Sequence, residues 1–188
     1  MLVIDDVLEI PAPWTPVEFL VREACQDWEV REAMALRRAV FCIEQGIFTG
    51  DDRDAIDDQA QLLVAMSCSA GMPEQVVGTV RIFEKEPGVW WGSRLAVHPS
   101  YRGQGHLSAN LGATLIRLAV SRAHAQGCHT FLAHVQAQNI PLFRKLHWMT
   151  LRELSLHGRP HGEMQADMAR YTPCFDALSG FVALAKGA

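Results

Sequence analysis

The sequence predicts an α/β fold: a mixed β-sheet in one domain, with helices packed against it. The chain has 188 residues, 49% of them hydrophobic, which is enough to bury one sizeable core. Segments with strand-like patterns lie on both sides of a central strand–helix–strand unit. That order of elements favours a mixed sheet over an all-helical or all-strand architecture.

The N-terminal part predicts an arm, a strand and a helix. Residues 1–16 contain three prolines and are expected to form an arm, whereas residues 17–24 alternate as a first strand does. A helix is predicted over 28–45, with Asp27 as its N-cap and Gly46 just beyond its end. Its apolar stripe consists of Ala33, Leu36, Val40 and Phe41.

An acid-rich segment separates this helix from three more strands. Its acids are Asp51, Asp52, Asp54, Asp57 and Asp58. Two interpretations stay open, a solvated loop or a loop that attracts a cationic amine. Strands are predicted over 61–70, 76–86 and 89–97, and the turn-rich residues 71–75 predict a hairpin between the first two.

The second half begins with a helix and ends with strands. The helix is predicted over 111–126, ending before Gly127, and its repeating residues are Leu111, Leu115, Leu118 and Arg122. A strand over 129–135 and a short helix over 139–148 follow, with Pro141 tolerated in the first turn. Two strands over 149–157 and 163–169 complete the pattern.

These elements place one domain over 17–170, between the arm and a tail over 171–188. The apolar residues 181–185 of the tail could serve a homodimer contact. Because the N-terminus is acidic and no apolar run reaches about 18 residues, neither a secretory signal nor a membrane partner is expected. The five cysteines are odd in number and scattered, which predicts reduced thiols in a cytoplasmic protein without a metal site.

Charge is distributed unevenly along the chain. Residues 1–86 hold 17 acids and 7 Lys or Arg, whereas residues 87–152 hold 7 Lys or Arg and no acid. A buried sheet would lower the acid count there, but the pattern also indicates a segment that receives an anion. A nucleic acid is the less favoured anion, because the sequence pI is only about 6.0.

The anion site is predicted where the strand 89–97 hands over to the helix 111–126. Gly103 and Gly105 let the backbone approach a ligand, and the helix start offers unpaired N–H groups. Arg102 adds a forked cation suited to phosphate. The loop has no Lys-Ser/Thr pair of a P-loop, and Ser108 stands where a dinucleotide fingerprint needs glycine. A plain strand-to-helix turn remains the alternative.

Residues 94–119 resemble the acyl-CoA-binding segment of the GNAT superfamily of N-acyltransferases. The family pattern Arg/Gln-x-x-Gly-x-Gly/Ala is matched from Arg102 to His106, and Leu107 replaces the final small residue. Residues 37–48, 139–148 and 158–164 are also similar to family segments, so most of 17–170 is covered. The resemblance implies a splayed central mixed sheet flanked by helices, with acetyl-CoA as co-substrate and no metal.

The resemblance also implies the positions of the CoA-binding residues. Leu95, Ala96 and Val97 would bind the pantetheine arm, and the Val97 amide would be the oxyanion donor. Asn139 and Phe143 would lie at the thiol end of that arm. The diphosphate would be held by Arg102, Gly103, Gln104, Gly105, His106, Leu107 and Ser108.

The catalytic acid and base are less defined by the resemblance. Many family members protonate the leaving thiolate with a tyrosine, but the matching residue here is Phe143, and His147 replaces a glycine. His147 or His161 could substitute as the acid. Glu44 is the first carboxylate to test as general base, although it also fits an ordinary exposed residue at a helix end.

The leading hypothesis is an N-acetyltransferase that moves an acetyl group from acetyl-CoA to a primary amine of a cationic small molecule or peptide. Transfer would be direct, without a covalent enzyme intermediate. Because Phe143 cannot donate a proton, a non-catalytic acyl-CoA-binding sensor or regulatory module is the alternative.

Overall fold

The computed structural model describes residues 16–102 and 110–185. Its strands are β1 (Glu18–Glu23), β2 (Gln61–Ser69), β3 (Met72–Glu86), β4 (Val89–Val97), β5 (Thr130–Gln136), β6 (Trp148–Leu156), β7 (Arg159–Ala166) and β8 (Phe181–Leu184). Its α-helices are α1 (Asp27–Arg38), α2 (Leu111–Ala125) and α3 (Ile140–Lys145). A π-helical segment spans Ala39–Glu44, and 3₁₀ turns span Ala55–Asp58, Pro99–Tyr101, Ala137–Asn139 and Met168–Arg170.

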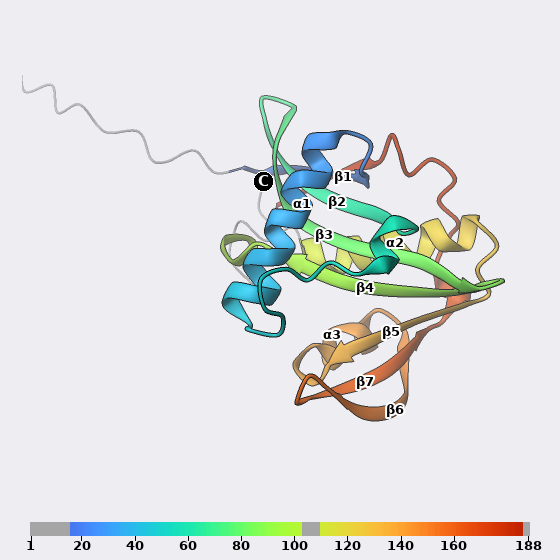
Figure 1. The fold of residues 1–188 in the computed structure, drawn as a ribbon. Helices are drawn as coiled ribbons and strands as arrows, with labels where there is room; N and C mark the ends of the chain where they lie inside the picture. The colour runs from blue at the N-terminus through green and yellow to red at the C-terminus, as the bar shows by residue number, and fades with distance from the viewer. Residues whose placement is uncertain (1–15, 103–109, 186–188) are drawn as a thin grey trace, which may run out of the picture.

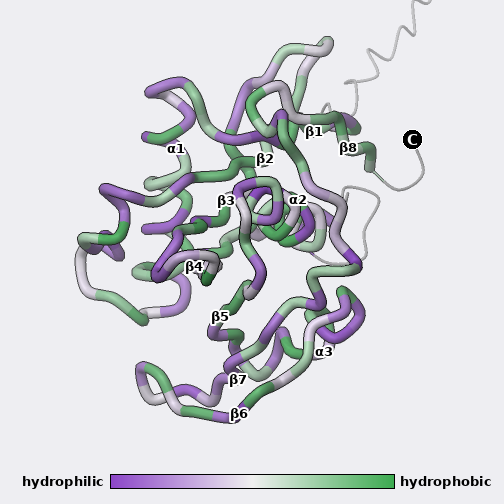
Figure 2. The backbone as a smooth tube through the Cα atoms, turned by 90° about the vertical axis from the view of Figure 1, so that its right-hand side faces the viewer, coloured by the Kyte–Doolittle hydropathy of each residue, from purple (hydrophilic) through white to green (hydrophobic). Residues whose placement is uncertain are grey.

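The eight strands form one mixed sheet in the order β6-β7-β5-β4-β3-β2-β1-β8. Among the strand pairs of the described residues, only β4–β5 is parallel, and the chain crosses between these two strands through α2. Figure 2 shows β1 and β8 at one end of the sheet and β6 and β7 at the other. The predicted mixed sheet flanked by helices is confirmed.

The helices α1 and α2 cover opposite faces of the sheet (Figure 1). Successive side chains of a strand point to opposite faces. On β2, Leu63 and Ala65 therefore pack with the α2 side. Val64 and Met66 pack with Ala33 and Leu36 of α1 and with Val40 of the π-helical segment. The buried side chains of β2 thus serve two cores at once, which explains why this strand is apolar without a polar face.

The parallel pair β4–β5 parts in the middle of β4. The two strands are in register only from Val89–Thr130 to Gly92–Ala133. Beyond that point a bulge in β4 shifts its register against β3, and Arg94 adopts a left-handed φ of 55°. A bulge bends its strand, so the second half of β4 turns away from β5. Figure 1 shows β5, β6 and β7 diverging from β4 as a separate wing.

The structure corrects two predicted ends. Gln26, not Asp27, is the N-cap of α1, because the Glu29 carboxylate accepts the N–H groups of Cys25 and Gln26 at 2.7 and 3.2 Å. The hairpin between β2 and β3 turns at Ala70 and Gly71, both with positive φ, so β3 begins at Met72 and includes most of the predicted turn.

The last hairpin is tighter than the sequence predicted, and the structure contains one strand that was not predicted. β7 begins at Arg159, directly after a His157–Gly158 turn in which both residues have positive φ. In the predicted tail, β8 pairs antiparallel with β1. The domain limits 17–170 and the homodimer contact at 181–185 stay predictions. Within the described ranges, no helix is both long and apolar enough to cross a membrane.

Candidate active site

A cavity of about 660 Å³ opens where β4 and β5 part. It reaches through the sheet, because its lining includes Ile116 and Ala119 of α2 on one side and Phe41 and Phe48 from the α1 side. The bulge of β4, the end of β5 and the β6–β7 hairpin frame it. A cavity of this size and mixed lining is typical of a small-molecule site.

The second half of β4 presents backbone groups to the place where β5 has diverged. His98 donates its N–H to the Val77 carbonyl at 2.8 Å, so the neighbouring N–H of Val97 points away from β3. The Val97 carbonyl oxygen accepts a hydrogen bond from Nε of Arg102 at 2.5 Å. Leu95 lines the cavity, whereas Ala96 is buried against α1.

Asn139 and Phe143 also line the cavity, from the short turn and helix after β5. Phe143 is 6% exposed and packs its edge against Trp148, with ring centroids 5.0 Å apart. The chain has two tyrosines, Tyr101 and Tyr171, and neither is among the lining residues. The cavity lining therefore offers no phenol that could act as an acid.

His161 is a buried histidine of β7 in the cavity lining. Its Nδ1 lies 2.9 Å from the Arg159 carbonyl oxygen. Since a carbonyl only accepts, Nδ1 carries the proton of this hydrogen bond, and in the neutral ring the lone pair is on Nε2. His157, in the adjoining turn, lines the cavity too. Its ring packs edge-to-face with the Phe48 ring, with centroids 5.0 Å apart.

Glu44 closes the π-helical segment after α1 and forms a two-pronged ion pair with Arg102, at 2.5 and 2.9 Å. The hydrogen bond from Arg102 lowers the pKa of Glu44 below that of an ordinary glutamate. Arg102 thereby joins the end of α1 to the end of β4. The sequence predicted Glu44 as a candidate general base and Arg102 as a ligand of the diphosphate, without a contact between them.

His147 is not brought to this cavity. It is exposed, has a φ of 63°, and lies in a separate pocket of about 320 Å³ with Arg117, Lys145 and Arg170. Gly103, Gln104, Gly105, His106, Leu107 and Ser108 lie outside the described residues. In the described part of the chain, no group of three or more His, Cys, Asp or Glu side chains is placed to hold a metal ion.

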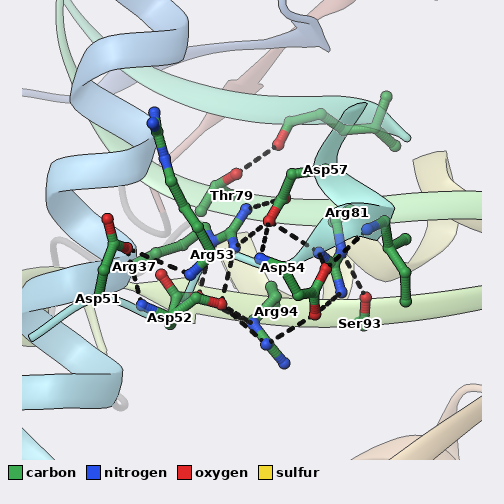
Figure 3. A network of polar contacts seen from close by, with 12 residues as sticks. Arg37, Asp51, Asp52, Arg53, Asp54, Asp57, Thr79, Arg81, Ser93 and Arg94 are labelled. Carbon is green, nitrogen blue, oxygen red and sulfur yellow. Dashed lines mark hydrogen bonds and ion pairs between the residues drawn. The ribbon is translucent and has the colours of Figure 1, made fainter. Parts of the chain in front are cut away.

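A network of three arginines and three aspartates lies beside the cavity (Figure 3), and its members Asp54, Arg81 and Arg94 line it. Arg37 of α1 binds Asp52 at 2.8 Å and Asp57 at 2.6 Å, and its side chain is fully buried. Arg81 binds Asp54 at 2.6 Å and Asp57 at 3.0 Å. Asp52, Asp54 and Asp57 are therefore paired with arginines, whereas Asp51 and Asp58 of the same segment are exposed. Attraction of a cationic amine by this segment stays a prediction.

Arg94 completes the network from the bulge of β4. It binds Asp52 at 2.9 Å and Asp54 at 3.1 Å, and its guanidinium lies 4.5 Å from the Phe48 ring centroid. These contacts hold a non-glycine residue in the left-handed region, which is otherwise unfavourable. The sequence contained one signal for this network. Arg81 lies within the apolar part of β3, and a buried arginine requires a partner of opposite charge.

Comparisons with known proteins agree with this architecture. The model of the Acetyltransferase (GNAT) family matches residues 21–148. A mycothiol acetyltransferase of Streptomyces bingchenggensis is 37% identical over 78 residues, which are 40% of this chain. The chain spans only 25% of that relative's length.

Solved structures share the fold at low sequence identity. An acyl-CoA N-acyltransferase from Pseudomonas aeruginosa superposes with a TM-score of 0.62 at 17% identity, over 79% of this chain and 98% of that one. The CoA-dependent acyl-homoserine lactone synthase BjaI, solved with SAM and isopentyl-CoA, gives 0.66 at 14% identity, over 87% and 94%. The GNAT-like splayed sheet expected from the sequence is therefore confirmed.

Proposed function

Because the chain belongs to the GNAT acetyltransferase family, we propose that it transfers an acetyl group from acetyl-CoA directly to a primary amine. The observation that carries the proposal is the parting of β4 and β5 after Gly92, which opens the cavity through the sheet. The thioester of the acyl donor can then enter the cavity from one face of the sheet while the acceptor amine enters from the other.

The residues around the parting fit acetyl-CoA, which supplies the activated thioester. The outward N–H of Val97 and the backbone near Leu95 provide hydrogen-bonding groups of the kind that an extended pantetheine amide chain requires. Asn139 adds a polar side chain at the end of β5. The Val97 N–H is also the group we assign to stabilise negative charge on the carbonyl oxygen during attack.

We assign the general base to His161. A lysine-like amine has a pKa of about 10.4 in solution, so at neutral pH the enzyme must remove a proton. The Nε2 lone pair of His161 can accept it, since Nδ1 is occupied by the Arg159 carbonyl. Glu44 is a weaker candidate, because its ion pair with Arg102 lowers its basicity.

No protonating side chain is assigned to the leaving sulfur. Phe143 supplies an apolar surface against Trp148, and it has no proton to give. A thiol with a pKa of about 8.5 leaves as a thiolate far more readily than an alkoxide does. The geometry is therefore consistent with departure of the thiolate without an acid.

The test is release of free thiol from acetyl-CoA with a panel of primary amines, for the native protein and three variants. His161→Asn is expected to lower kcat at pH 7 by about 100-fold or more. The loss should shrink as pH approaches the amine pKa, where the acceptor needs no base. Glu44→Gln and His147→Gln should lose far less, and an equal loss for all three would remove His161 from its role.

A non-catalytic acyl-CoA sensor remains the second candidate, because no tyrosine lines the cavity. Calorimetry separates the two. Binding of acetyl-CoA with no turnover across the panel, and no gain from Phe143→Tyr, would favour the sensor. Absence of acetyl-CoA binding would remove both functions.

A further inference from the structure

The face of the sheet that meets α1 carries an alternating set of cations and aromatic rings. On β3, Arg81, Phe83 and Lys85 occupy alternate positions, so they share a face. Opposite them on β4 are Ser93 and Trp91, paired in register with Arg81 and Phe83. All five residues line the cavity.

Three aromatic rings on this side already have a cation over them. Lys85 lies 5.4 Å from the Trp91 ring, and Arg81 lies 5.9 Å from the Phe83 ring. Arg94 covers Phe48 at 4.5 Å. Cationic ligands are commonly bound over such rings, but here the protein's own cations occupy that position.

The carboxylates near this face are also engaged. Asp54 is the one carboxylate in the described lining, and it binds both Arg81 and Arg94. Burial alone would raise its pKa, but the hydrogen bond and charge of Arg81 lower it instead. A second ammonium group on the acceptor would therefore meet arginines before it met a free carboxylate.

Lys85 is different from the arginines of the lining. It is exposed at the rim, and among the described residues no carboxylate lies within ion-pairing distance of its Nζ. Its ammonium group is held over Trp91 and faces the same cavity as His161. The lining thus holds both His161, a proton acceptor for the reactive amine, and Lys85, a cation without a carboxylate partner among the described residues.

We propose that the acceptor carries an anionic group, a carboxylate or a phosphate, in addition to its reactive amine, and that Lys85 pairs with this anion. The inference rests on the proposed acetyl transfer and replaces the cationic acceptor expected from the sequence. Charge complementarity carries it, since Arg81 and Arg94 of the lining are neutralised by aspartates, whereas Lys85 has no carboxylate partner among the described residues.

The experiment compares amines of equal length that differ only at the far end. Thiol release is measured with ω-amino acids, ω-aminoalkyl phosphates, alkylamines and diamines of two to six carbons. We expect kcat/KM to rank anionic above neutral and neutral above dicationic tails. The carboxylate and phosphate series show which anion is preferred, and a higher rank for either one supports the proposal.

Three variants test whether Lys85 is the cause. Lys85→Gln should reduce the preference for the anionic over the neutral amine by about fivefold, as expected for a partly exposed ion pair. Lys85→Glu should shift the preference toward the diamine. Arg31→Gln removes one positive charge from the exposed side of α1, outside the lining, and should leave the preference unchanged.

Failure of the acceptor assignment can be separated from failure of the proposed transfer. A diamine preference in the native protein, or a Lys85→Gln effect equal for all amines, overturns the acceptor assignment while transfer stands. If no amine is acetylated, titration calorimetry with the ω-amino acids decides. Binding that Lys85→Gln weakens supports the anionic ligand without transfer, and absence of binding overturns both.

Discussion

Replacing Arg37 with methionine should destabilise the protein strongly, because it removes a cation from the interior of the ion-pair network. The Arg37 side chain is 0% exposed and donates to Asp52 and Asp57, which lie 15 and 20 residues further along the chain. Methionine fills a similar space without charge. Both aspartates would then stay buried with one cation fewer.

The size of the loss follows from the partners that remain. Removing one member of a buried ion pair typically costs about 3–5 kcal/mol. Asp52 keeps Arg94 and Asp57 keeps Arg81, so the lower end, about 3 kcal/mol, is expected. With a urea m-value of about 2 kcal/mol/M, the unfolding midpoint should fall by about 1.5 M.

Urea unfolding followed by tryptophan fluorescence measures this shift, with Arg31→Met on the exposed side of α1 as the matched control. Arg37→Lys should fall between the native protein and Arg37→Met, because an ammonium cannot bind two carboxylates as a guanidinium does. A loss below about 1 kcal/mol for Arg37→Met would show that the network is hydrated, and would refute the reasoning.

The loss of stability caused by Arg37→Met should be larger at neutral pH than at acidic pH. Burial alone would raise the pKa of Asp57, but the hydrogen bond from Arg37 and further donors hold it well below the ordinary aspartate value. A depressed folded pKa contributes stability above the unfolded value of about 3.9, and this is lost as pH falls toward the folded pKa. The gap between native protein and Arg37→Met should therefore be full at pH 7 and narrow below about pH 4.

Three further predictions concern packing and thiol chemistry. Gly180→Ala should lower the melting temperature and speed hydrogen exchange in β8, because its φ is +66° and a Cβ would lie 2.3 Å from the Val21 carbonyl oxygen; an unchanged melting temperature would contradict this. Leu115→Ala should cost about 2–5 kcal/mol in urea unfolding, since Leu115 is fully buried, and a loss near zero would refute its place in the core. Burial raises the pKa of Cys128 to about 11, so this thiol should resist a disulfide reagent at pH 8 until the protein unfolds, whereas exposed Cys25 reacts at once.

The sheet could be predicted where local pattern and burial agree. The strand expected over 89–97 is β4 with the same limits, because a turn precedes it and a proline follows it closely. The four-residue β8 was missed for the opposite reason. Phe181, Val182 and Leu184 are 43–58% exposed, and pairing with β1 joins segments about 160 residues apart in sequence.

The candidate site likewise contains residues that the sequence predicted and contacts that it could not predict. Leu95, Asn139 and Phe143 were expected from contiguous motifs, and all three line the cavity. The contacts that set its charge could not be predicted, because each joins segments far apart in sequence. Arg102 lies 58 residues from Glu44, and no local pattern indicates that pair.

The uneven charge of the sequence takes on a different meaning in the folded chain. The acids of the first half were expected to face an external cation, and the acid-free segment an external anion. In the structure, Asp52 and Asp54 bind Arg94, and Glu44 binds Arg102, so these acids and arginines neutralise each other beside the site. Among the described lining residues of the acceptor face, Lys85 is the cation without a carboxylate partner. A local excess of positive charge attracts an anion whatever the net charge of the chain, and the acceptor's charge should therefore follow the cavity rather than the sequence total of −4.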